Sequence, residues 1–348
     1  MSEYLVRSRS PLRLGLAGGG TDIESFYSQH GGCVLNATID LYACCTIKPK
    51  SDNKICFDAT DIGESFETEL TDYIEPTGNL KLHKAIYNRI VKDYNGGKPF
   101  GAFKMITYCD SPPGSGLGSS STLVVSIIKA YTELLSIPFG DYDIAHLAYE
   151  IERKDLAMNG GKQDQYAGTF GGVNFMEFDK DDKTIINPLR VKRWIMSELE
   201  QSLVLFYTGV SRDSSNIIDE QNKGIKNKSP KTIESMLAIK NEAFEMKEAL
   251  LKGDIKAIAE SMHRGWEAKK ASSNKISNLN IDRIYDMVMD AGAMAGKISG
   301  AGGGGFIMFL VPPSKRMNIL KLLEQEKDGR TMPCHFVDHG TQSWRITR

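Results

Sequence analysis

A stretch rich in glycine and serine, residues 112–121, is the strongest candidate in the sequence for binding chemistry. It reads Pro-Pro-Gly-Ser-Gly-Leu-Gly-Ser-Ser-Ser. The apolar run before it, 102–109, is typical of a strand, and residues 122–135 carry apolar side chains at helical spacing. This order places backbone N–H groups and serine hydroxyls at the positive end of a helix, where anions bind readily.

The predicted ligand of this stretch is the phosphate chain of a nucleotide. A turn whose serines merely cap the helix is the simpler interpretation, since Ser and Gly are common at helix starts. Three glycines at alternate positions and then three serines exceed what a cap needs, which favours a phosphate loop. Two other loop types are excluded. A Walker A loop would contain a lysine, and this stretch has none. A dinucleotide fingerprint needs an acid at the end of a second strand, whereas Glu133, at about the right distance, lies inside the expected helix. The residues predicted to bind phosphate are Pro113, Gly114, Ser115, Gly116, Leu117, Gly118, Ser119, Ser120 and Ser121.

A second candidate region lies near the N-terminus. Residues 12–16 alternate in a pattern typical of a strand with one buried face, and the glycine-rich segment 17–22 follows. Asp22 could cap a helix beginning near Ile23 or accept hydrogen bonds from a substrate hydroxyl. Arg13 is unusual in an otherwise apolar strand, because a buried arginine needs an anionic partner.

Two acidic residues stand out in the middle of the chain. A helix is expected from Asp141 to about Leu156, and Glu152 falls about 80° from Ile144, at the edge of its apolar face. Glu152 could be a solvated rim residue or a metal ligand. Asp164 lies in the glycine-rich segment 159–172 and could either cap a short helix or act in a site.

Composition narrows the class of protein. The chain has 348 residues, enough for two domains, and 41% of them are hydrophobic. The net charge of -1 does not favour a nucleic-acid or membrane-surface partner. We expect a cytoplasmic protein of the α/β or α+β class, because the sequence shows no signal-peptide pattern, no long apolar run and no paired cysteine motif.

Further elements follow from apolar spacing. Strands are expected at 32–39, 43–47, 54–58, 203–207, 306–311 and near 335–337, and helices at 81–94, 233–251, 255–270, 281–294 and 315–326. The polar run 221–231 is expected to be a solvated loop. A charged segment followed by Pro188 suggests that a first domain ends near residue 190.

Three glycine-rich segments in this order, 10–22, 112–121 and 297–305, resemble those of the GHMP kinase superfamily. The resemblance implies an α+β fold of two domains, with a ribosomal protein S5 domain 2-like domain at 1–190 and a ferredoxin-like domain at 191–348. Four shorter segments resemble the D-glycero-D-manno-heptose 7-phosphate kinases within this superfamily: 18–22, 150–153, 161–165 and 208–212. Those enzymes phosphorylate the anomeric hydroxyl of the sugar on the route to GDP-heptose for surface polysaccharide.

The resemblance also implies cofactors and roles. ATP and Mg²⁺ would be required, with Ser120 and Glu152 as metal ligands, Asp164 as the group that takes the hydroxyl proton, and Arg13 as a stabiliser of developing charge. The substrate-binding residues would be Gly20, Thr21, Asp22, Lys162, Asp164, Arg212, Gly300, Ala301 and Gly302. Lys162 and Arg212 are the candidates for holding a phosphate already on the sugar, although either could form a local salt bridge. A kinase for another sugar, such as L-fucose or a galactose derivative, and an inactive sugar- or nucleotide-binding regulator remain alternatives, and the oligomeric state is not indicated.

Overall fold

A computed structural model describes residues 4–210 and 215–347. In this part of the chain the first of two sheets has eight strands, with the order β12-β1-β2-β5-β3-β4 and with β6 and β7 attached beside β2. Its strands are β1 (Tyr4–Ala17), β2 (Gly32–Pro49), β3 (Lys54–Ala59), β4 (Glu64–Glu69), β5 (Phe103–Cys109), β6 (Val173–Phe178), β7 (Thr184–Pro188) and β12 (Gln342–Thr347). The segments expected at 32–39 and 43–47 are one continuous strand, β2.

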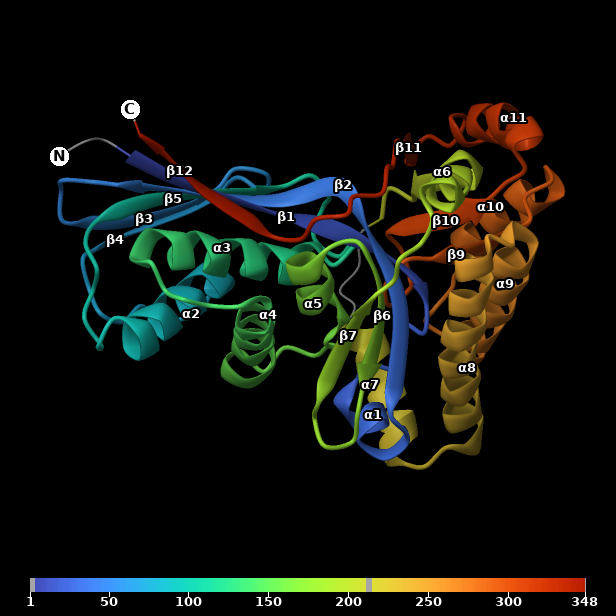
Figure 1. The fold of residues 1–348 in the computed structure, drawn as a ribbon, viewed down its shortest axis with the longest axis horizontal. Coiled ribbons are helices and arrows are strands. Elements are labelled where there is room, and N and C mark those ends of the chain that lie inside the picture. The colour runs from blue at the N-terminus through green and yellow to red at the C-terminus, as the bar shows by residue number, and fades with distance from the viewer. Residues whose placement is uncertain (1–3, 211–214, 348) are drawn as a thin grey trace.

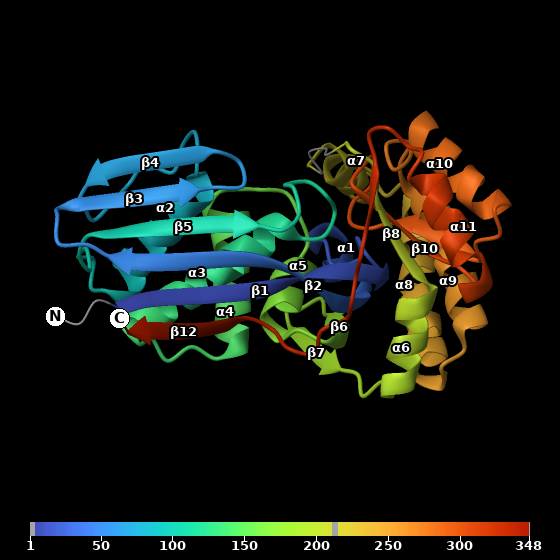
Figure 2. The same cartoon turned by 90° about the horizontal axis from the view of Figure 1, so that it is seen from above.

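Helices cover one face of this sheet (Figures 1 and 2). The long strands run side by side, and α3 lies beneath them with α2 and α4. The helices of this half are α1 (Glu24–His30), α2 (Lys81–Arg89), α3 (Ser119–Leu135), α4 (Asp141–Glu150) and α5 (Gln163–Phe170). The helices expected at 81–94 and 141–156 both end in a π-helical turn, η1 (Ile90–Tyr94) and η2 (Ile151–Asp155).

The second sheet has the topology of a ferredoxin-like domain. Its strands are β8 (Leu203–Tyr207), β9 (Ala295–Ile298), β10 (Phe306–Leu310) and β11 (Arg330–Met332), in the spatial order β11-β8-β10-β9. This is the β-α-β-β-α-β arrangement that the sequence led us to expect. Its helices are α6 (Arg193–Ser202), α7 (Ser215–Lys226), α8 (Pro230–Lys252), α9 (Ile255–Ser272), α10 (Leu279–Asp290) and α11 (Pro313–Leu323).

The end of the chain returns to the first sheet. Strand β12 pairs antiparallel with β1, from Tyr4 opposite Thr347 to Arg9 opposite Gln342, and Figure 2 shows it at the sheet edge. A division at residue 190 therefore does not separate the two sheets, because β12 completes the first one. The strand expected near 335–337 is only an isolated bridge between Ile39 and Phe336.

The prediction of a solvated loop at 221–231 was wrong. Helix α7 extends to Lys226, and α8 begins at Pro230. The polar composition hid an amphipathic helix, because Ile217, Ile218 and Ile225 provide the buried face at helical spacing.

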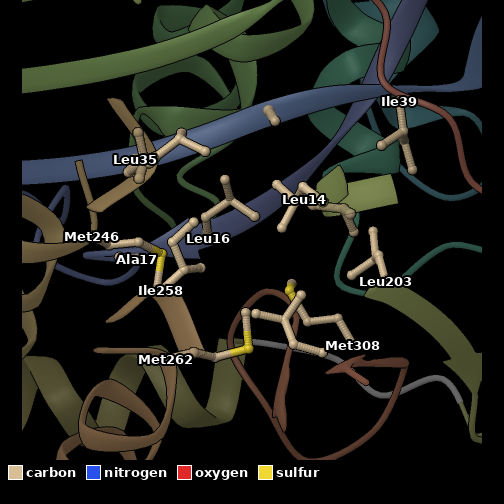
Figure 3. Packing of buried hydrophobic residues seen from close by; sticks show 14 of the residues in the cluster. Leu14, Leu16, Ala17, Leu35, Ile39, Leu203, Met246, Ile258, Met262 and Met308 are labelled. Carbon is tan, nitrogen blue, oxygen red and sulfur yellow. The ribbon is translucent and has the colours of Figure 1, made fainter. Parts of the chain in front are cut away.

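One hydrophobic cluster joins the two sheets (Figure 3). Leu14 and Leu35 come from the first sheet, Leu203 and Met308 from the second, and Met246 from α8. The two halves share buried apolar surface, and we therefore expect them to unfold together. Among the described residues, none of the helices combines the length and apolar character that a membrane span requires.

Truncating this shared core should destabilise the whole protein. Leu14 is fully buried, so Leu14→Ala should lower the free energy of unfolding by about 2–5 kcal/mol. Denaturant unfolding followed by circular dichroism measures the change, and a single transition is expected. Leu279→Ala is the matched control, because that side chain is 90% exposed. Two separate transitions in the wild-type protein would contradict the shared core.

Candidate functional site

The loop at 112–121 places the start of α3 at an open cleft. Gly114, Gly116 and Gly118 all have positive φ angles, between 72° and 85°, which favour glycine because it lacks a Cβ. Gly118 is the N-cap of α3, and within the described part of the chain no side chain caps this helix. The N–H groups of the first helical turn have no partner within the helix. The arrangement therefore fits anion binding rather than the alternative of a serine-capped turn.

The glycine-rich segment 297–305, which begins at the end of β9, packs directly against this loop. A Cβ on Gly116 would lie 2.3 Å from the Ser299 carbonyl oxygen, and one on Gly305 would lie 2.2 Å from that of Ser115. The Ser299 hydroxyl donates to the Gly116 carbonyl at 3.0 Å, and Phe306 N–H donates to the Ser115 carbonyl at 2.9 Å. The second domain thus fixes the backbone of the phosphate loop.

Arg13 and Asp164 form an ion pair beside the loop, in which the guanidinium is buried and the carboxylate is partly exposed. The guanidinium donates to Asp164 Oδ1 through Nε at 2.8 Å and Nη2 at 2.6 Å, and through Nη1 to the Gly116 carbonyl at 2.5 Å. Arg13 is only 3% exposed, so its expected anionic partner is confirmed. Asp164 lies in the first turn of α5, and a Cβ on Gly118 would come within 3.1 Å of its Cγ. The carboxylate therefore stands beside the loop rather than capping a helix.

Asp22 holds the start of α5 from a distant segment. Its Oδ2 accepts from the Gln163 backbone N–H at 3.0 Å, and its Oδ1 accepts from Gln163 Nε2 at 3.2 Å and Gly20 N–H at 3.0 Å. Only glycine fits at position 161, because a Cβ there would lie 1.8 Å from Asp22 Oδ2. Asp22 does not cap α1, whose N-cap is Ile23. Asp22 is also among the residues that line the cleft.

Glu152 is a deeply buried carboxylate whose hydrogen-bond partners are neutral. It is 1% exposed, accepts from the Ser121 hydroxyl at 3.0 Å and from Gln165 Nε2 at 2.5 Å, and lies 4.0 Å from Arg153. The rim interpretation of Glu152 is thereby excluded. This buried carboxylate has its nearest cation, Arg153, at 4.0 Å and lines the cleft with Ser120 and Ser121. These side chains offer the hard oxygen ligands that Mg²⁺ prefers. The described residues contain no cluster of three or more His, Cys, Asp or Glu side chains that could form a cage for a metal.

Two cavities meet at the start of α3. The main cleft encloses about 980 Å³ including its open mouth. Its lining includes these predicted residues: Arg13, Gly20, Asp22, Gly114, Gly116, Gly118, Ser119, Ser120, Ser121, Glu152, Asp164, Gly300, Ala301 and Gly302. A second, more apolar cavity of about 810 Å³ shares Ser119 and Ser120 with it and continues past Pro113 towards Leu80, Leu82 and His83. Burial lowers the pKa of His83 to about 4, so its ring is neutral at pH 7.

Of the two cations predicted to bind the substrate phosphate, Lys162 and Arg212, the structure describes only Lys162. Lys162 is 1% exposed, and its ammonium pairs with Asp182 Oδ1 at 2.5 Å and lies over the Tyr27 and Tyr149 rings at 4.8 and 4.9 Å. Its role as a phosphate ligand needs correction, because the alternative of a local salt bridge describes it. Arg212 lies outside the described residues. Thr21, another predicted substrate residue, is buried and bonds to the Gly18 and Cys33 carbonyls.

Sequence reasoning missed two polar residues of the cleft, Gln163 and Lys269. Gln163 lies next to Asp164 within a motif already singled out, so its role could have been considered. Lys269 comes from α9 and lines the same cleft, and its ammonium donates to the Gly300 carbonyl at 2.5 Å. Lys269 and Lys270 are adjacent in an amphipathic helix, and the sequence does not indicate that Lys269 points into a site.

Comparison with known proteins settles the family. Residues 81–172 match the GHMP kinases N terminal domain, and residues 246–323 match the GHMP kinases C terminal domain. The chain is 49% identical to the D-glycero-alpha-D-manno-heptose 7-phosphate kinase of Campylobacter jejuni, over 98% of this chain and 99% of the relative. The chain belongs to the GHMP kinases.

Solved structures agree with this assignment. A D-glycero-D-manno-heptose 1-phosphate kinase from Bacteroides thetaiotaomicron is similar with a TM-score of 0.84 and 45% identity, over 99% of this chain and 100% of that one. A galactokinase of Lactococcus lactis in complex with galactose shares the fold, with a TM-score of 0.77 and 19% identity over 97% and 95% of the two chains. The two-domain α+β fold expected from the sequence is therefore confirmed.

The local salt bridge of Lys162 leads to a prediction about stability. Lys162→Met should lower the free energy of unfolding by about 1–3 kcal/mol, because Asp182 loses its charged partner and the buried site loses its hydrogen bond. The KM for a sugar phosphate should stay unchanged. Lys180→Met is the control, because Lys180 is exposed and lies in the same β6–β7 connection as Asp182. An increased KM in Lys162→Met without loss of stability would restore Lys162 as a substrate ligand.

Proposed function

We propose that this GHMP kinase transfers the γ-phosphoryl group of ATP to the anomeric hydroxyl of D-glycero-D-manno-heptose 7-phosphate, giving heptose 1,7-bisphosphate. The observation that carries the proposal is the position of Asp164, held by Arg13 between the phosphate loop and Asp22. The similarity to a heptose 7-phosphate kinase over almost the whole chain supports the choice of sugar. The same substrate implies that the enzyme is cytoplasmic and acts on the route to GDP-heptose for surface or capsule polysaccharide.

The two cavities suggest how ATP would lie. The apolar cavity beside Leu80 and His83 has the character of a site for a base and ribose, and it opens onto the helix start at Ser119 and Ser120. The triphosphate would follow the N–H groups of the loop towards the main cleft. The γ-phosphate would then lie beside Asp164 and Arg13, with the sugar on the side of Asp22.

Phosphoryl transfer needs positioning and charge neutralisation more than covalent help from the protein. The anomeric oxygen attacks the γ-phosphorus, the bond from that phosphorus to the β,γ-bridging oxygen breaks, and ADP leaves. Asp164 would accept the hydroxyl proton, and Arg13 would hold the carboxylate in position and stabilise charge on the transferred group. Asp22 would accept a hydrogen bond from a sugar hydroxyl.

Glu152 and Ser120 would hold Mg²⁺, with Ser121 and Gln165 positioning the carboxylate. A bound magnesium ion supplies neutralisation of the phosphate charge. The Oε1 atom of Gln165 is buried and lacks a partner among the described atoms, which leaves a further oxygen directed into this region.

The substrate can be tested directly. The names of the similar proteins place the first phosphate differently, one as a 7-phosphate kinase and one as a 1-phosphate kinase. We expect ATP consumption with heptose 7-phosphate and product bearing phosphate at positions 1 and 7 by ³¹P NMR. Heptose 1-phosphate, L-fucose and galactose complete the panel. A higher kcat/KM with any of these three would overturn the assigned sugar, and inactivity with all four would favour a binding regulator.

Asp164→Asn should remove the proton acceptor while preserving the fold. We expect kcat to fall by about 10² to 10⁴, because that is the usual range for loss of a general base. Binding of a fluorescent ATP analogue, measured by titration, should change little. A variant that keeps wild-type turnover would remove Asp164 from the mechanism.

Glu152→Gln should weaken the metal site. The neutral amide is a poorer ligand than a carboxylate, so the Mg²⁺ concentration for half-maximal activity should rise by an order of magnitude or more. Activity measured against Mg²⁺ at fixed ATP gives this value. Glu150→Gln is the control, because Glu150 lies two residues before Glu152, does not line the cleft and pairs with Arg89 and Lys154. An unchanged Mg²⁺ titration would leave Glu152 with a structural role alone.

A further inference from the structure

Lys269 is a buried cation that forms no ion pair with any residue in 4–210 or 215–347. It lies in the last turn of α9, is 5% exposed, and donates to the Gly300 carbonyl. An ammonium carries three donors, and this backbone bond uses one of them. None of the ion pairs between described residues involves Lys269. Its charge is held at the cleft without a carboxylate of its own.

The groups around Lys269 are predominantly positive. Arg13 approaches from β1 and Lys297 from β9, and the Lys297 ammonium donates to the Gly15 carbonyl at 2.5 Å. Of the nearby carboxylates, Asp164 pairs with Arg13 and Glu242 on α8 pairs with Arg264. Asp22 accepts only from the neutral Gln163 and Gly20, so its charge opposes that of Lys269. The three cations Arg13, Lys269 and Lys297 thus face two carboxylates, Asp164 and Asp22. An excess of buried positive charge is costly unless an anionic ligand joins it.

The ammonium lies on the sugar side of the cleft. It is 3.9 Å from the position that a Cβ on Gly19 would take, and Gln163 Nε2 is 3.8 Å from the same position. The Gln163 side chain in turn bonds Asp22, the expected sugar ligand. Lys269 lines the main cleft together with Asp164, Asp22 and Gln163, and it also lines a small adjoining cavity with Gly19. The space left by Gly19 faces the cation.

We propose that Lys269 binds the phosphate group that the sugar already carries, and that it thereby selects a phosphorylated over an unphosphorylated sugar. This inference rests on the proposed function of the cleft. It fills the role first sought in Lys162, whose charge is neutralised by Asp182. The competing anion is the γ-phosphate of ATP, because Gly300 also contacts Gly116 of the phosphate loop.

The ionisation of Lys269 suits a reversible anion site. Burial and the charge of Arg13 lower the pKa of Lys269 to about 8, against the opposing effect of Asp22. The side chain is therefore mostly charged at pH 7 in the free enzyme, and a bound phosphate dianion would raise its pKa further. Above pH 8 the free enzyme loses this charge, so binding of the sugar phosphate should weaken.

The test compares kcat/KM for heptose 7-phosphate and for unphosphorylated heptose in wild-type enzyme, Lys269→Met, Lys269→Arg and Lys270→Met. Methionine preserves the length of the buried side chain without its charge. Lys270 is the matched control, since its ammonium pairs with Glu267 instead. Circular dichroism and thermal unfolding confirm that each variant folds.

In Lys269→Met the ratio of kcat/KM for the phosphorylated over the unphosphorylated sugar should fall on the order of 10- to 100-fold, the worth of a charged hydrogen bond. The KM for ATP should remain near its wild-type value, and Lys270→Met should keep the wild-type ratio. An equal loss with both sugars, or a raised KM for ATP alone, would overturn the proposal. Wild-type inactivity with heptose 7-phosphate would instead refute the proposed function itself.

A pH profile adds a readout that a purely structural role would not change. Wild-type kcat/KM for heptose 7-phosphate should decline above about pH 8, relative to that for the unphosphorylated sugar. Lys269→Arg, which stays charged, should retain selectivity and lose this decline, because arginine does not deprotonate in this range. The same decline in Lys269→Arg would assign it to another group and contradict the proposal.

Discussion

The ion pair between the buried Arg13 and the partly exposed Asp164 is the constraint on which the rest of the site depends. It links β1 to the first turn of α5, and the same guanidinium reaches the Gly116 carbonyl of the phosphate loop. Charges removed from water persist only when their geometry and hydrogen bonds are satisfied. Ser299 on the second domain completes this set by donating to the same carbonyl. The position of the Asp164 carboxylate is thus coupled to both domains.

The sequence was sufficient wherever a local pattern has a local physical cause. Alternate glycines at 114, 116 and 118 predicted a loop at a helix start, and each of them has positive φ. Arg13 in an apolar strand predicted an anionic partner, because a buried arginine rarely lacks one. The glycine-rich segments, taken in order, then indicated the family and with it the α+β fold of two domains.

The sequence was insufficient where the cause lies between distant segments. Nothing near Lys162 in the chain reveals that Asp182 and two tyrosine rings enclose its ammonium. Lys269 and Lys270 are equivalent by composition, yet the helix directs one to the cleft and the other to Glu267. The pairing of β12 with β1 was not predicted either. Residues 342–347 carry no apolar run, and their partner strand β1 lies at the opposite end of the chain.

Strand β12 has a consequence for how the protein is made. During synthesis β1 emerges first and β12 emerges last among the described strands, so the edge of β1 that pairs with β12 stays unpaired until β12 has been made. Exposed edges can recruit other chains, especially while folding intermediates are populated. The nascent chain is therefore open to misassociation along this edge until β12 has emerged and pairs with β1.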